Sequence, residues 1–182
     1  PHAARAGSRH RPREGSGRPW ERAGRANGRR RGRRDAEDII DALTRKGIFA
    51  PLFREPATWR AWEVYLRALF GLGIDDPKDR PLFRECTGLV KPPAEAVRES
   101  FVICGRRSGK SYISAIIASF LAAFRDWKPY LSPGERGWIF VIANDKAQAG
   151  IIKAYISGIF HRVPCLKTLV EKETVETLEL RN

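Results

Sequence analysis

Two apolar runs, each followed by a helical pattern, dominate the hydrophobic pattern of the chain. The first run, Phe101–Cys104, is short and partly β-branched, which is typical of a buried strand, and it stops at Gly105. Apolar residues then recur so densely over 113–124 that this stretch predicts a helix packed under a sheet. A second apolar run, 137–143, predicts another covered strand, and 144–160 predict the next helix. This alternation predicts an α/β fold with a parallel sheet.

The rest of the chain predicts shorter elements. Asp35 is expected to cap a helix that stops at Gly47, and Pro56 opens a second helix. Residues 74–99 are expected to form a connector with a short helix, and Thr174–Leu180 begins one more strand. The apolar residues of the second helix form one stripe, made of Trp59, Trp62, Leu66, Leu69 and Phe70.

The segment between the first strand and its helix has the residues of a phosphate-binding loop. Gly109 lets the backbone bend so that N–H groups converge on a phosphate, and the helix start adds its positive dipole end. Lys110 can reach the β- and γ-phosphates, and the Ser111 hydroxyl can ligate magnesium. The expected binding residues are Gly105, Arg106, Arg107, Ser108, Gly109, Lys110 and Ser111.

One position departs from the usual loop pattern. A glycine is normally found five residues before the Gly-Lys pair, and this chain has Cys104 there. The alternative interpretation is that the loop is a basic surface turn. The predicted strand before it and the helix after it favour the phosphate-binding interpretation.

The positive charge is concentrated at the N-terminus. Residues 1–34 contain twelve arginines, no lysine and two glutamates, so they hold +10 of the formal charge of +13. This segment has too few apolar residues to form a core, and we expect it to be disordered. Either it is an arginine-rich arm for nucleic-acid phosphates, or it is non-native or upstream sequence.

Cysteine content and hydropathy restrict the cellular setting. The three cysteines, Cys86, Cys104 and Cys165, are too few and too far apart for a disulfide framework or a zinc site, so a reducing, cytoplasmic setting is expected. The apolar runs are too short to span a bilayer, and we expect no membrane role. Because the chain contains no methionine, it is expected to be a fragment or a translation without its true start.

ATP hydrolysis at such a loop also needs an acid at the end of another strand. Asp145 follows the second apolar run, but Lys146 follows it where a glutamate is usual, and Asn144-Asp145 also fits a helix N-terminus. Glu171, Glu173 and Glu176 have no apolar strand before them and are expected to form a solvated face. The missing acid is therefore expected beyond Asn182.

Over residues 50–182 the chain resembles the large terminase subunit of tailed bacteriophages, the ATPase that translocates DNA into procapsids. That family shows loops that lack the first glycine and carry an arginine. The segments that carry the resemblance are Thr58–Trp62 with Leu69–Gly71, Gly105–Ser111, Pro133–Arg136, and Val141–Asp145 with Gln148-Ala149.

The resemblance implies an incomplete RecA-like P-loop NTPase of the ASCE type, a three-layer fold around a parallel sheet. Residues 1–34 would be the tail, 35–98 a helical segment, and 99–182 the ATPase core, truncated before its Walker B acids. Lys110 and Arg106 would be catalytic, with Arg106 acting as a finger in cis, and Ser111 would hold Mg²⁺ beside ATP. Trp62 stands where many terminases have a glutamine that reads adenine.

The partners implied by the resemblance are double-stranded DNA, a small terminase subunit and the portal of a procapsid, in the host cytoplasm. Two alternatives remain at this stage. The chain is another RecA-like nucleic-acid-dependent ATPase such as a helicase, or it is a non-catalytic basic nucleic-acid-binding protein with an inert loop. Packing in the core is the alternative interpretation of Trp62.

Overall fold

The computed structural model describes residues 38–45 and 48–181. The chain divides into two units, residues 1–30 and 31–182, and every described residue belongs to the second. The predicted tail, 1–34, and the predicted cap Asp35 lie outside the described residues.

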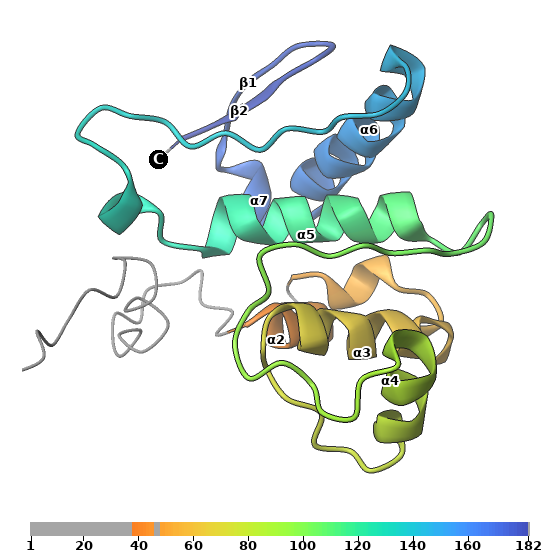
Figure 1. The fold of residues 1–182 in the computed structure, drawn as a ribbon. Coiled ribbons are helices and arrows are strands. Elements are labelled where there is room, and N and C mark those ends of the chain that lie inside the picture. Colours follow the sequence, from red (N-terminus) through yellow and green to blue (C-terminus); the bar gives the residue numbers. More distant parts are fainter. Residues whose placement is uncertain (1–37, 46–47, 182) are drawn as a thin grey trace, which may run out of the picture. The chain divides into compact units, whose positions relative to one another are not determined.

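Helices make up about half of the described residues (Figure 1). They are α2 (Ile39–Thr44), α3 (Arg60–Leu69), α4 (Asp79–Thr87), α5 (Lys110–Phe124), α6 (Lys146–Arg162) and α7 (Pro164–Lys167). Short 3-10 helices cover Ala50–Leu52, Pro56–Trp59 and Lys128–Tyr130. The strands β1 (Val170–Glu173) and β2 (Leu178–Leu180) pair with each other in antiparallel orientation.

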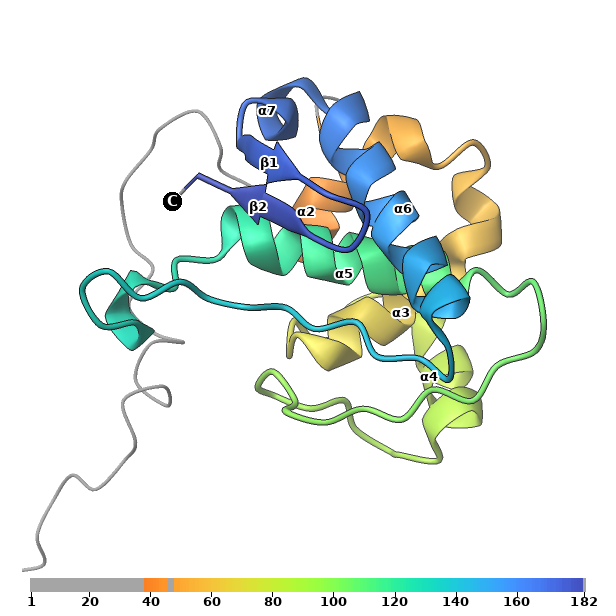
Figure 2. The same ribbon diagram turned by 90° about the horizontal axis from the view of Figure 1, so that it is seen from above.

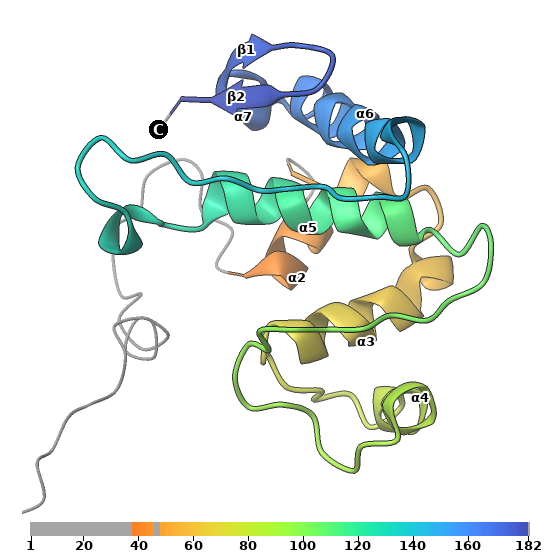
Figure 3. The ribbon, with the colours of Figure 1, turned by 45° about the horizontal axis from the view of Figure 1, so that its top comes forward.

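Helix α5 is the centre of the main hydrophobic core. It lies between α6 and α7 on one side and α2 and α3 on the other (Figures 1 and 3). Its residues Ile116 and Phe120 are 0% and 3% exposed, and Phe160 of α6 is 0% exposed. The apolar character of 113–124 therefore predicted the helix and its burial, but helices cover it in place of the predicted sheet.

A smaller cluster joins α3 to α4 and consists of Val64, Ile74 and Phe83. Polar contacts reinforce this packing. Arg60 at the start of α3 donates to Asp76 and to Asp79, each at 2.7 Å. Because the Asp79 residue is only 5% exposed, its carboxylate needs this guanidinium as a partner.

The predicted parallel sheet is absent from the described residues, so the P-loop three-layer α/β fold is wrong. The described sheet consists of β1 and β2 alone and is antiparallel. The predicted strands Phe101–Cys104 and 137–143 are unpaired coil, and 137–145 run along α5 without a strand beside them (Figures 2 and 3). The prediction failed because an apolar run identifies a segment that could be buried, whereas a strand also needs a neighbour for its N–H and C=O groups.

Large apolar side chains of these two segments are exposed to solvent. Phe101 and Ile103 are 92% and 101% exposed, and Trp138, Phe140 and Ile142 are 71%, 76% and 90% exposed. Backbone groups of 101–104 and 137–143 make no hydrogen bond to any other described residue. The most apolar coil of the chain therefore faces solvent, with its polar backbone unpaired by protein.

Two smaller predictions differ from the structure in their boundaries, and one strand was not predicted. The first helix is α2, and its cap is Asp38, whose carboxylate accepts hydrogen bonds from the backbone N–H groups of Ile40 and Asp41 at 2.8 Å. The predicted strand Thr174–Leu180 is a turn followed by β2, because Thr174 closes the turn with Thr177. Its partner β1 was not predicted, since Val170–Glu173 has charged residues at three of its four positions.

No helix among the described residues has the length and apolar character that crossing a bilayer requires.

Candidate functional site

The predicted phosphate-binding loop leads directly into α5. The helix begins at Lys110, and Gly109 before it has φ +88°, in the left-handed region. Arg107 also has a positive φ, +62°, which is uncommon for a residue with a side chain. No side chain caps the first turn of α5. The N–H groups of that turn therefore remain available to an anion.

Three cations surround this uncapped helix start. Arg106, Arg107 and Lys110 are exposed, and no carboxylate of the described residues pairs with any of them. Like charges so close in sequence repel one another unless an anion joins them. Charge and helix dipole therefore favour a negative ligand at the same place.

Two tryptophans, Trp59 and Trp62, lie against the loop. The indole Nε1 of Trp62 in α3 donates a hydrogen bond to the carbonyl oxygen of Ser108 at 2.7 Å. A Cβ atom placed on Gly109 would lie 2.8 Å from Cζ3 of Trp59, closer than real Cβ contacts. Glycine is thus required at 109 for its backbone conformation and for the space it leaves. Trp62 was predicted as a site residue, and the structure brings it to the loop through its polar edge.

The two serines of the loop differ in their surroundings. The hydroxyl of Ser108 is buried and has no hydrogen-bond partner among the described residues. Ser111 lies in the first turn of α5 and is half-buried. A buried hydroxyl without a partner has lost its water without replacement, which costs free energy. Gly105 lies in the exposed part of the loop, with nothing within 4 Å of a Cβ built on it.

An aromatic cluster that the sequence reasoning missed supports the start of α5. Tyr112 makes ring contacts with Phe53 at 5.9 Å, Trp59 at 5.8 Å and Tyr155 at 5.4 Å between centroids. Burial raises the pKa of the Tyr112 hydroxyl above its usual range. Rings from four separate segments thus fix the helix end that carries the loop. The position of Tyr112 in the first turn, next to the loop, was the available signal.

The acids considered for magnesium have structural partners. Asp145 is the N-cap of α6, and its carboxylate accepts from the N–H of Gln148 at 2.8 Å. Glu171 lies 3.4 Å from Arg136, and Glu176 lies 3.2 Å from Lys146. Glu173 bonds Lys153 and His161 of α6. All four are thus engaged in a cap or an ion pair.

The described residues contain no group of three or more His, Cys, Asp or Glu side chains that could hold a metal ion. Ser111, the expected metal ligand, lies in the first turn of α5, and no such group exists there among the described residues. The loop as described can attract and orient a phosphate group.

Comparison of the chain with protein-family models, with curated proteins and with solved structures gives no match.

Proposed function

We propose that Gly105–Ser111 and the start of α5 bind the phosphates of ATP. The observation that carries the proposal is the helix start at Lys110, which follows a left-handed glycine, has no side-chain cap and lies among three cations without carboxylate partners. Backbone N–H groups would contact the phosphate oxygens, and the helix dipole would add about 0.3–1 kcal/mol for a negative charge.

Individual side chains take distinct roles in this proposal. Lys110 lies at the first helical position and would contact the β- and γ-phosphates as a mobile charge. Arg106, exposed in the loop, would approach the γ-phosphate. Ser111 would supply a hydroxyl ligand to Mg²⁺, which would bridge the phosphates and neutralise their charge. Trp62 fixes the backbone at Ser108, and its ring face is half-buried beside the loop.

We further propose that this site belongs to a DNA-packaging ATPase of the terminase type. The support is the sequence resemblance over residues 50–182, including a loop that has Cys104 in place of the first glycine and an arginine at 106. Double-stranded DNA, a small terminase subunit and a procapsid portal are the partners that this proposal entails.

A second candidate is phosphate binding without catalysis. It is favoured because Asp145, the acid considered for this role, is bonded as the N-cap of α6, whereas hydrolysis needs a group that orients the attacking water. Both candidate functions include phosphate binding at the loop, but only the first includes ATP hydrolysis.

The test is titration of a fluorescent ATP analogue into the full chain and into Lys110→Ala. Loss of a charge-assisted contact should weaken binding by very roughly ten- to hundredfold. Lys128→Ala, an exposed lysine in the 3-10 helix Lys128–Tyr130, is the matched control and should bind normally. Equal affinity of wild type and Lys110→Ala would refute the phosphate site. Phosphate release is then measured with and without duplex DNA. Release of phosphate supports the DNA-packaging ATPase, and its absence supports phosphate binding without catalysis.

A further inference from the structure

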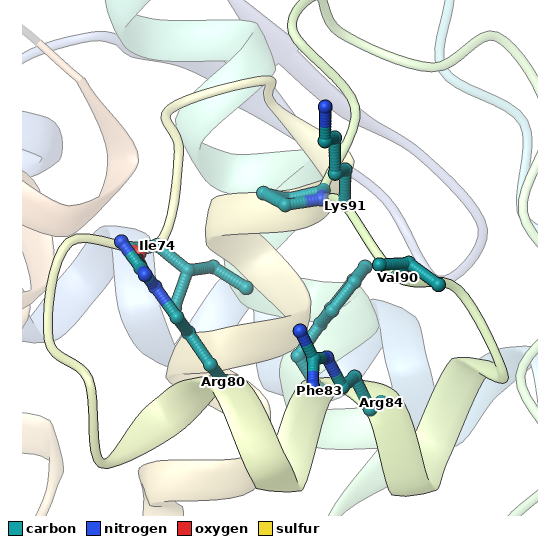
Figure 4. A pocket seen from close by; sticks show the side chains of 7 residues that line it. Ile74, Arg80, Phe83, Arg84, Val90 and Lys91 are labelled. Atoms are coloured by element: carbon teal, nitrogen blue, oxygen red, sulfur yellow. Dashed lines mark hydrogen bonds between the residues drawn. The ribbon is translucent and has the colours of Figure 1, made fainter.

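A pocket of about 350 Å³ lies beside α4, and none of its lining residues belongs to the phosphate loop (Figure 4). Its apolar lining comes from Ile74, Phe83, Val90 and Pro92, and its charged lining from Arg80, Arg84 and Lys91. The volume is at the lower end of the range for small-molecule sites.

The apolar lining is partly fixed and partly uncovered. Ile74 and Phe83 are 5% and 2% exposed and belong to the cluster that joins α3 to α4. Val90 is 70% exposed, although it lies in the same pocket. An apolar group placed in the pocket would lie on a rigid floor and remove the Val90 side chain from water.

The charged lining has no balancing acid. Arg80 and Arg84 are four residues apart on α4, a spacing that places like charges side by side and disfavours the helix. Among the described residues, neither they nor Lys91 form an ion pair with a carboxylate. Asp76 and Asp79, close by in the sequence, are both bonded to Arg60.

The scaffold holds the two arginines in different ways. Arg80 Nε donates to the carbonyl oxygen of Ile74 at 3.4 Å, which keeps its side chain on the Ile74 side of the pocket (Figure 4). The Arg84 side chain extends beside Phe83, and Lys91 rises from the segment after α4 with its ammonium group away from the floor (Figure 4). An anion over the floor would therefore meet the arginines first, and the flexible Lys91 stem could follow it.

We propose that this pocket binds a small organic oxyanion, a phosphate monoester or a carboxylate, carried on an apolar ring. A guanidinium fork pairs with the planar oxygen pairs of either group, and an anion relieves the repulsion between Arg80 and Arg84. The ring covers Ile74, Phe83 and Val90. This site is independent of the proposed ATP site, since the two share no residue.

The experiment is isothermal titration calorimetry of the full chain with four probes: phenyl phosphate, benzoate, inorganic phosphate and phenol. Phenyl phosphate or benzoate should bind, inorganic phosphate about tenfold more weakly because it lacks the ring, and phenol not measurably. Stronger binding of phenyl phosphate identifies a phosphate monoester site, and stronger binding of benzoate a carboxylate site.

Variants then assign the binding to the pocket. Arg84→Gln should weaken the binding of phenyl phosphate about tenfold. Lys91→Gln, a change outside α4, should weaken it severalfold. Val90→Asn should lower the affinity for phenyl phosphate toward that for inorganic phosphate. It should leave the affinity for inorganic phosphate unchanged. Arg54→Gln, an exposed arginine outside the pocket, should bind as wild type does.

Three results would overturn the proposal. These are failure of both ring-bearing anions to bind, unchanged affinity in Arg84→Gln and Lys91→Gln, and equal weakening by Arg54→Gln. If single-stranded DNA binds while both ring-bearing anions fail to bind, the surface is a polyanion site instead. Because Lys110 is outside the pocket, failure here leaves the ATP test unaffected.

Discussion

Trp62 in α3 donates its indole hydrogen to the carbonyl oxygen of Ser108 at 2.7 Å, across 46 positions of sequence. This bond ties the candidate phosphate loop to a helix that precedes it in the chain. It turns a glycine-containing coil into a loop with one defined backbone position just before α5. The geometry of the site therefore depends on α3 as well as on the loop sequence.

Trp62→Phe should lower the free energy of unfolding by about 1–2 kcal/mol, because the Ser108 carbonyl loses its donor. It should also weaken binding of an ATP analogue, since the loop loses its tether. Urea unfolding and fluorescence titration measure the two effects. Trp127→Phe is the matched control, because Trp127 Nε1 makes an equally short bond to the Leu121 carbonyl, 2.7 Å. It should lower stability alone, and equal affinity of Trp62→Phe and wild type would contradict the tether.

Gly109→Ala should destabilise the protein by about 2 kcal/mol or more. The alanine must adopt φ near +88°, which costs roughly 1–2 kcal/mol, and its Cβ would collide with the Trp59 ring at 2.8 Å. Gly88→Ala provides the comparison, because Gly88 has φ +69° and nothing within 4 Å of a built Cβ. Gly88→Ala should lose only the part of the stability that comes from the strained backbone. Equal losses in the two variants would show that Trp59 imposes no steric limit at Gly109.

Asp145→Ala should destabilise the protein by about 1 kcal/mol through loss of the N-cap of α6, as thermal unfolding would show. Asp145→Asn should retain most of that stability, because asparagine is an equally good N-cap. Neither variant should change nucleotide affinity. A large loss of Mg²⁺-dependent nucleotide binding in the stable Asp145→Asn variant would instead assign a metal role to this carboxylate.

The pH dependence should include a term from Glu173. Hydrogen bonds from Lys153, then Ser157 and His161, lower the pKa of Glu173 from 4.5 to about 2. A carboxyl with a lowered pKa contributes stability that is complete above pH 4.5 and is lost as the pH falls toward 2. The Glu173 side chain is 28% exposed, so solvent screening limits the contribution to about 1 kcal/mol.

Melting temperatures measured from pH 7 to pH 2 would test this term. Glu173→Gln should be less stable than wild type at pH 7 and nearly equal to it at pH 2. Glu176→Gln, which removes the exposed 3.2 Å pair with Lys146, should follow the wild-type curve closely. A constant difference between Glu173→Gln and wild type across this range would rule out the pKa shift as its source.

Local sequence was sufficient to predict α5 and its burial. The dense apolar pattern of 113–124 predicted a buried helix, and α5 is that helix, with Ile116 0% exposed. Helix α5 begins at Lys110, three positions before the predicted apolar stretch 113–124. These features depend on neighbours three or four positions away, which periodicity reports directly.

The sheet and the surroundings of the loop were decided by tertiary structure. Phe101–Cys104 and 137–143 have strand-like sequences, yet they remain unpaired, because strand formation depends on a partner that the local pattern cannot specify. The side chain of Trp62 could be assigned to the core or to a nucleotide, and only the folded chain shows its bond to Ser108. Contacts between residues distant in sequence follow from the packing of whole elements, and no spacing rule along the chain reports them.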